Sequence, residues 1–126
     1  FSLPDALPIC SMSLRTAGNF PGRIAAAASY HGGRLATELP ESPHLLAPKM
    51  RARIYAGMAI DDASMTPEMA GRLEVALSEA KIGHQLELYD DCKHGWTIKG
   101  NAVYNETGAE RHWETMLSLF GSTLKA

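Results

Sequence analysis

The sequence predicts an α/β protein built on a parallel sheet of about three strands with flanking helices. Three short apolar segments are typical of strands, and loops or segments with helical spacing separate them. Strands that alternate with helices along a chain favour a parallel sheet with helices packed on it. Polar residues follow the second and third strands, where open parallel sheets place their ligand sites.

Size and charge exclude several classes of function. The 126 residues are 45% hydrophobic and 21% charged, which is typical of one globular domain. A net charge of −2 gives no bulk attraction to nucleic acid or to an anionic membrane, so neither is an expected partner. The two cysteines lie far apart and indicate no disulfide framework, so a cytoplasmic setting is expected.

The first ten residues, FSLPDALPIC, differ in character from the rest of the chain. Pro4 and Pro8 are unfavourable in a helix interior and in a central strand, and no initiating Met is present. The string resembles a translated sequencing adapter. We therefore predict a non-native or disordered segment at residues 1–10, joined to a domain at residues 11–126.

The first part of this domain predicts a helix end, a strand and a long loop. Residues 11–18 carry apolar side chains at helical spacing and end at Gly18, a residue type common just after a helix. Residues 24–30 (IAAAASY) are apolar throughout, as in strands buried on both faces of a parallel sheet. Residues 34–49 contain three prolines and are expected to form a loop.

The middle of the chain predicts a strand followed by a helix. Residues 51–58 (RARIYAGM) are typical of a second buried strand, and residues 59–65 form the loop after it. Residues 66–68 (TPE) are a strong helix start, because Thr can cap, Pro suits the first helical position and Glu is stabilised there. This helix is expected to reach Lys81, just before Gly83.

Residues 84–89 (HQLELY) predict a third strand close to a sheet edge. Their alternating polarity indicates one drier face, with His84, Leu86 and Leu88 on it and Tyr89 on the wetter face.

A last helix is expected near the C-terminus. Thr107 and Glu110 match the spacing of a capping box at its start. Its apolar residues are expected to form one core-facing stripe, made of Trp113, Met116, Leu117, Phe120 and Leu124.

The loops after the second and third strands carry candidate catalytic groups. Asp61 and Asp62 occupy one loop and His94 the other. A carboxylate that orients an imidazole is the support pair of a nucleophilic hydrolase. The order, acid before histidine, matches the α/β-hydrolase order of nucleophile, acid and histidine. From the residues alone, His94 in a loop would most often be a solvated or locally bonded histidine, and Asp61 and Asp62 could form an ordinary polar loop before a helix N-terminus.

A set of sequence blocks, in the same order, resembles the dienelactone hydrolase family from about residue 11 to the end. The resemblance implies a partial α/β-hydrolase fold, namely its C-terminal half. The blocks are residues 24–34 (IAAAASYHGGR), 42–49 (SPHLLAPK), 54–69 (IYAGMAIDDASMTPEM), 89–96 (YDDCKHGW), 103–105 (VYN) and 109–113 (AERHW).

The resemblance also implies roles for individual residues. It makes Asp62 the catalytic acid and His94 the catalytic base, with Asp61 as the rival acid. Lys99 is expected where the family holds an anionic substrate. Trp96, close behind His94, is expected to line the pocket or to pack beside it.

The nucleophile of the family, usually a Cys in a Gly-x-Cys-x-Gly-Gly elbow, aligns with Leu7. Cys10 lies nearby, but it lacks the flanking glycines that a strained elbow requires. We therefore expect the chain alone to be inactive. In a complete enzyme the thiolate would attack a small-molecule ester or lactone and His94 would then activate water, and no cofactor is expected.

Other interpretations remain. The acid and histidine could belong to a non-catalytic binding or interaction module of the same fold, or the chain could be an inert truncated gene product.

His31, which precedes two glycines at a strand end, could shape the site or serve a structural role. Cys92, His94 and His112 lack a fourth ligand at a recognisable metal-binding spacing. The natural substrate, the choice of Cys or Ser as nucleophile and the oligomeric state do not follow from the sequence.

Overall fold

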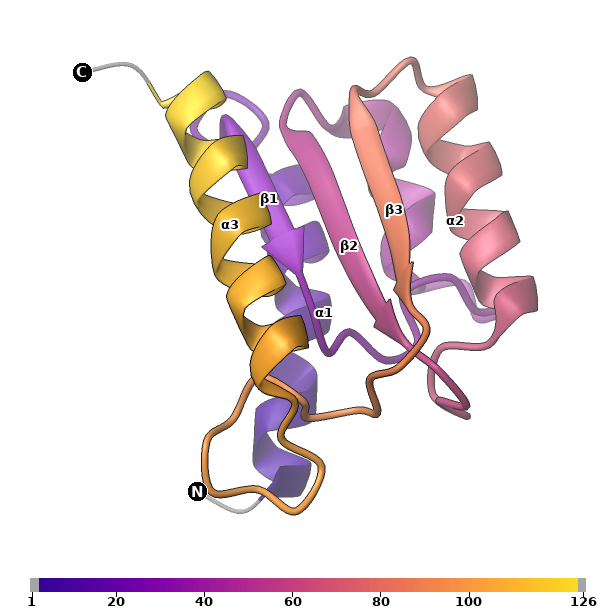
Figure 1. Cartoon of the computed structure of the whole chain (residues 1–126). Coiled ribbons are helices and arrows are strands. Elements are labelled where there is room, and N and C mark those ends of the chain that lie inside the picture. The colour runs from indigo at the N-terminus through magenta and orange to yellow at the C-terminus, as the bar shows by residue number, and fades with distance from the viewer. Residues whose placement is uncertain (1–2, 125–126) are drawn as a thin grey trace.

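A computed structural model describes the backbone of residues 3–124 and the side chains of residues 11–124. Strands and helices alternate along the chain, as predicted. In order, the elements are α1 (Leu3–Asn19), β1 (Ala26–Ser29), the short 3-10 helix η1 (Pro43–Lys49), β2 (Arg53–Ala59), α2 (Pro67–Glu79), β3 (His84–Tyr89) and α3 (Glu106–Thr123) (Figure 1).

The three strands form one parallel sheet in the order β1–β2–β3. This confirms the predicted three-stranded parallel sheet with flanking helices, and β3 has both its predicted bounds and its predicted edge position. Strands β1 and β2 begin at Ala26 and Arg53, slightly later than expected. All three strands point the same way, so the loops that follow them meet at one end of the sheet (Figure 1).

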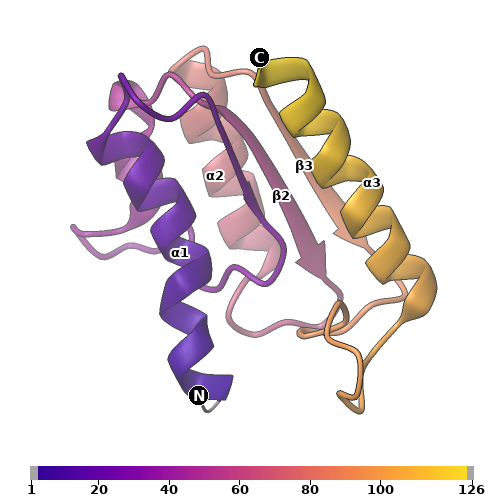
Figure 2. The same cartoon turned by 90° about the vertical axis from the view of Figure 1, so that its left-hand side faces the viewer.

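Helices cover both faces of the sheet. Helices α1 and α2 lie on one face and α3 lies on the other (Figure 2). The core under α1 and α2 is aliphatic, whereas the core under α3 is built on aromatic rings. The aliphatic core contains Leu14, Ala17, Leu35, Ala47, Ile54, Ala56, Leu73 and Leu77, among others, and the aromatic core contains Tyr30, Tyr55, Tyr89 and Trp96.

The predicted faces of β3 are wrong at its end. Tyr89 is fully buried, whereas Leu88 is 54% exposed. Helix α3 covers the face that holds Tyr89, so that face is the drier one at this position. The Tyr89 hydroxyl lies 3.0 Å from the hydroxyl of Tyr55, which meets the hydrogen-bonding need of a buried phenol.

The helix ends agree with the sequence at the start of α2 and differ at the start of α3 and at the end of α2, which stops at Glu79 rather than at Lys81. The predicted cap of α2 is present, since Thr66 Oγ1 accepts a hydrogen bond from the amide of Met69 at 3.3 Å. For α3, the capping box at Thr107 is wrong. The helix begins at Glu106, and the Asn105 side chain caps it by accepting from the Gly108 amide at 2.8 Å. Asn caps a helix as well as Ser or Thr does, which is why spacing alone chose the wrong residue.

Helix α1 runs from Leu3 to Asn19, so residues 11–18 form its last turns, as predicted, and its backbone also includes residues 3–10. The side chains of residues 1–10 lie outside the described residues, so their predicted separate origin stays a prediction. The predicted loop at residues 34–49 contains η1, whose Ala47 is buried in the aliphatic core.

The apolar stripe of α3 only partly faces the core. Met116 and Phe120 pack against the aromatic core, and Leu119, outside the predicted stripe, is buried in it. Trp113 is 51% exposed and Leu117 is 63% exposed. The prediction that Trp113 packs in the core is therefore wrong, because the buried face of α3 contains Gly108, Ala109 and Leu119 instead. Across residues 3–124, the helices are all too short or too polar to cross a bilayer.

Gly108, in the first turn of α3, is a site where added volume should be costly. A Cβ atom there would lie 2.3 Å from Cys92 Sγ and 3.0 Å from the Trp96 ring, and both side chains are buried. Gly108→Ala is therefore expected to lower the free energy of unfolding by about 1–3 kcal/mol. Urea denaturation followed by far-UV circular dichroism measures this.

Gly121 supplies the matched control in the same helix. Nothing lies within 4 Å of a Cβ added there. Gly121→Ala should raise stability by roughly 0.5–1 kcal/mol, because Ala loses less backbone entropy than Gly in a helix. Equal effects of the two substitutions would contradict the close packing of α3 on the loop before it.

Candidate active site

The loops that follow β2 and β3 are joined just beyond the sheet. The amide of Ile60 donates to the carbonyl of Cys92 at 2.8 Å, which continues the pairing of the two strands. The amide of Cys92 donates to the carbonyl of Tyr89 at 3.1 Å and turns the chain back. This backbone arrangement brings the loop with Asp62 beside the loop with His94.

Asp62 and His94 are in direct hydrogen-bond contact. His94 Nδ1 lies 2.7 Å from Asp62 Oδ2. The Asp62 side chain is only 9% exposed, whereas that of His94 is 31% exposed. An ionised carboxylate only accepts hydrogen bonds, so Nδ1 carries the hydrogen and Nε2 is the basic ring nitrogen. Among residues 11–124, no hydrogen bond occupies Nε2.

Ser64 holds the second oxygen of Asp62. Oδ1 accepts from the Ser64 amide at 2.9 Å and from the Ser64 hydroxyl at 2.6 Å. Burial raises the pKa of Asp62, but the hydrogen bonds from Ser64 and His94 outweigh burial and leave this pKa below its ordinary value. Asp62 is therefore a fixed, ionised partner for the imidazole at neutral pH.

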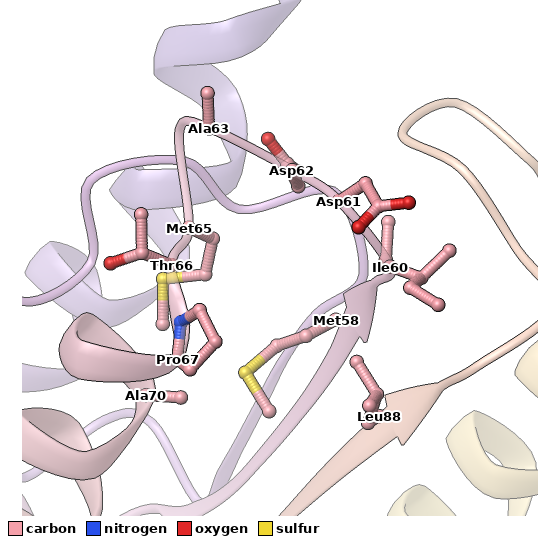
Figure 3. Close-up of a pocket in the computed structure, with 11 residues that line it drawn as sticks. Met58, Ile60, Asp61, Asp62, Ala63, Met65, Thr66, Pro67, Ala70 and Leu88 are labelled. Carbon is pink, nitrogen blue, oxygen red and sulfur yellow. The ribbon is translucent and has the colours of Figure 1, made fainter.

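Asp61, the rival acid, is placed differently. Its side chain is exposed, and it is Asp62 that accepts the hydrogen bond from His94. Figure 3 shows the two carboxylates pointing away from one another. The backbone of Asp61 has φ 53°, a left-handed conformation that Asp tolerates better than most residues. This turn at Asp61 aims the following side chain toward His94.

The loop with His94 is closed at its base by Asn105. The Asn105 amide donates to the Trp96 carbonyl at 3.0 Å, and its side chain donates to the Asp91 carbonyl at 3.2 Å. Gly95 has φ 95°, which favours glycine directly after His94. The conformation of this loop therefore depends on one glycine and one asparagine.

Trp96 and Lys99, the two predicted substrate contacts, lie in different surroundings. Trp96 is fully buried and packs on Tyr89, with 4.8 Å between ring centroids. This burial favours the packing role of Trp96 over direct contact with a substrate. Lys99 is exposed farther along the same loop. The structure thus brings together Asp62 and His94, the predicted acid and base, but neither predicted substrate contact joins them.

Sequence reasoning leaves the role of His31 open and gives no reason to single out Thr97. His31 Nε2 lies 3.1 Å from Thr97 Oγ1, and its ring centroid lies 5.6 Å from that of His94. Sequence reasoning also misses Ser64 as a partner of Asp62, although an Asp with a Ser two positions later is a recognised local turn signal. The sequence signal that could have identified His31 as part of the site is its position before two glycines at a strand end.

A cavity of about 610 Å³ lies beside Asp62, on the same side of the sheet as α2. Figure 3 shows Met58, Met65 and Leu88 around it. Its lining is mostly apolar, and His94 is not part of it. The cavity therefore borders the carboxylate of Asp62, but it does not include the imidazole of His94.

The remaining candidate nucleophile and metal ligands are unsuited to those roles. Cys92 is buried, and burial together with its contact to Asp91 raises its pKa to about 11, so its thiol is protonated and inert. The side chains of Leu7 and Cys10 lie outside the described residues. Within residues 11–124, no group of three His, Cys, Asp or Glu side chains is placed to hold a metal ion.

Known proteins resemble this chain in sequence and in fold. A protein of Synechocystis sp. assigned as a carboxymethylenebutenolidase is 27% identical over 105 residues, which are 81% of this chain and 43% of that protein. A crystal structure of a protein assigned as a dienelactone hydrolase from Klebsiella pneumoniae has a TM-score of 0.78 at 22% identity, over 87% of this chain and 47% of its own. A dienelactone hydrolase-like promiscuous phosphotriesterase from metagenomic libraries has a TM-score of 0.74 at 20% identity, over 90% of this chain and 48% of its own.

The chain therefore spans about half the length of these relatives. The two solved structures establish the likeness in fold. The model of one family, described as the dienelactone hydrolase family, matches residues 10–124, nearly the whole chain. By this match, the chain belongs to the dienelactone hydrolase family.

Proposed function

We propose that this chain supplies the catalytic acid and base of a hydrolase for carboxylic esters or lactones. The observation that carries the proposal is the 2.7 Å contact between His94 Nδ1 and Asp62 Oδ2 at the carboxyl end of the sheet. In this arrangement Asp62 fixes the tautomer of the ring and stabilises the imidazolium that forms when Nε2 takes up a proton. The family match supports this proposal.

The reaction divides the work between this chain and a nucleophile. His94 Nε2 takes the proton of a thiol or hydroxyl as that group attacks the substrate carbonyl, and returns it to the leaving alcohol. His94 then takes a proton from water as the water attacks the acyl group, and returns this proton to the nucleophile as its bond to the acyl carbon breaks and the acid product is released. We propose Asp62 as the acid, with Lys99 as an exposed cation for an anionic part of the substrate.

We further propose that the chain corresponds to the C-terminal half of such an enzyme and is inactive alone. Cys92, the free cysteine among residues 11–124, is buried and protonated at neutral pH, so its thiol is not suited to act as the nucleophile. The isolated chain should therefore hydrolyse p-nitrophenyl acetate no faster than its His94→Ala variant. A clear excess of wild-type activity would mean that the chain has its own nucleophile.

A hybrid protein tests the hydrolase function directly. The hybrid joins residues 11–126 to the first half of a family member that carries the Gly-x-Cys-x-Gly-Gly elbow. We expect the hybrid to hydrolyse p-nitrophenyl acetate and a simple lactone with a burst of acyl-enzyme, whereas a Cys→Ala version of the elbow should not. A hybrid that folds but does not turn over would instead favour a non-catalytic binding module.

A further inference from the structure

Building on the proposed function, we propose that His31 is a positioning residue that ties the loop carrying His94 to the carboxyl end of β1 through its contact with Thr97. This role lies outside the acid–base pair itself. It concerns how the imidazole of His94 is kept facing Asp62.

His31 contacts the loop at three points. Its Nε2 lies 3.1 Å from Thr97 Oγ1, and its ring packs edge-on against Trp96 with 4.6 Å between centroids. Its ring centroid lies 5.6 Å from that of His94. Because His31 follows β1 closely, these contacts connect the end of β1 with the loop that follows β3.

The other contacts that hold the loop with His94 do not reach the segment after β1. Asp62 holds one nitrogen of His94, and Asn105 closes the loop at its base. Between them, Gly95 has φ 95° and leaves the chain free to turn. Within residues 11–124, the contact between Thr97 and His31 is the one side-chain hydrogen bond that joins this loop to the segment after β1.

The charge of His31 suits this role. Burial, followed by the nearby His94 and His112, lowers the pKa of His31 to about 4, against a small opposing effect of Asp62. At neutral pH the ring is therefore uncharged, and Nε2 can accept the hydrogen of the Thr97 hydroxyl. An uncharged neighbour also places no positive charge against the imidazolium that forms on His94 during the proposed reaction.

Proton exchange at His94 tests the proposal on the 126-residue chain itself. In a sample labelled with ¹⁵N-histidine, the Nδ1–H hydrogen bonded to Asp62 should give a protected downfield resonance. We expect His31→Ala and Thr97→Val each to speed the exchange of this hydrogen with water by about tenfold, the effect of losing one ordinary hydrogen bond. The double variant should exchange no faster than the faster single variant, because both remove the same contact.

Two conservative variants separate positioning from general stability. Thr97→Ser keeps the hydroxyl, and His31→Gln supplies a side-chain amide that can bond to the Thr97 hydroxyl, so exchange in both variants should stay as slow as in wild type. Amide spectra report whether each variant is folded. Should His31→Ala unfold, Thr97→Val still decides, since it removes only a hydroxyl. Exchange within twofold of wild type in Thr97→Val would overturn the proposal.

A separate variant reports on the proposed function. Asp62→Asn should abolish the protected resonance whatever the role of His31. A wild-type chain without that resonance would contradict the acid–base pair itself. A resonance that depends on Asp62 but not on Thr97 would leave the pair intact and reject only the role of His31.

Discussion

Replacement of His94 by Ala in the hybrid is expected to lower kcat/KM for p-nitrophenyl acetate by on the order of 10³-fold or more, and Asp62→Asn by a comparable factor. Without the imidazole, no group takes the proton of the nucleophile. Asn at position 62 keeps the shape of the side chain, but its amide can donate to Nδ1 and so favours the wrong tautomer of the ring. Steady-state kinetics at pH 7 to 8 measure both effects.

Asp61→Asn provides the control for this experiment. Asp61 is adjacent in sequence and equal in charge, but it is exposed and does not bond to His94. Its replacement should leave kcat/KM within about twofold of the unsubstituted hybrid, because surface charges contribute little. If Asp61→Asn were as damaging as Asp62→Asn, the assignment of Asp62 as the acid would be wrong.

A double variant tests whether His94 and Asp62 act together. His94 contacts Oδ2 of Asp62, whereas Ser64 donates to the other oxygen, Oδ1. If the two residues act as a unit, the variant that carries both His94→Ala and Asp62→Asn should be hardly slower than His94→Ala alone. Additive losses would indicate that the two residues act in separate steps rather than as one acid–base pair.

The sheet could be predicted from sequence because each strand is set by a local signal. The apolar run at residues 24–30 and the alternation at residues 84–89 identify strands, and the spacing between them leaves room for crossovers. The alternation of polar and apolar residues in a strand does not tell which of its faces a later helix will cover. Helix α3 packs over Tyr89, so the phenol is buried and Leu88 is exposed.

The closeness of Asp62 and His94 could be predicted because parallel strands bring their following loops to one end of the sheet. The family resemblance then selected Asp62 over Asp61, in agreement with the hydrogen bond to His94. The supporting contacts were harder to foresee. The bond between His31 and Thr97 joins residues 66 positions apart, and it depends on the positive φ of Gly95. No periodicity in the sequence encodes such a loop conformation.

The acid stability of the chain should depend strongly on His31. In the folded protein, burial and then the neighbouring His94 and His112 lower the pKa of this ring to about 4, against an ordinary value of 6.5. Between these two pH values the unfolded chain binds a proton that the folded chain does not. Protonation therefore favours the unfolded state, so the contribution of His31 is complete above pH 6.5 and is lost as the pH falls toward 4.

The loss attributable to His31 between pH 7 and pH 4.5 should be about 1–2 kcal/mol of unfolding free energy, after allowance for solvent screening of a half-buried ring. Urea titrations at pH 7 and pH 4.5 give this quantity as the difference between wild type and His31→Gln, which cannot take up the proton. His44 and His112 also have lowered pKa values, but both proteins contain them, so their effects cancel in the comparison.

His84 offers a control of opposite sign. Burial opposes its charge, but hydrogen bonds to the Ile82 carbonyl and to Glu74 raise its pKa above the ordinary value. Its contribution to stability is present below pH 6.5 and is lost as the pH rises through the higher folded value. His84→Gln should therefore make acid destabilisation steeper, whereas His31→Gln should make it shallower.

If His31→Gln lost as much stability as wild type between pH 7 and pH 4.5, the ring of His31 would carry its proton in the folded protein. His31 could then not serve as the uncharged neighbour of His94 at mildly acidic pH.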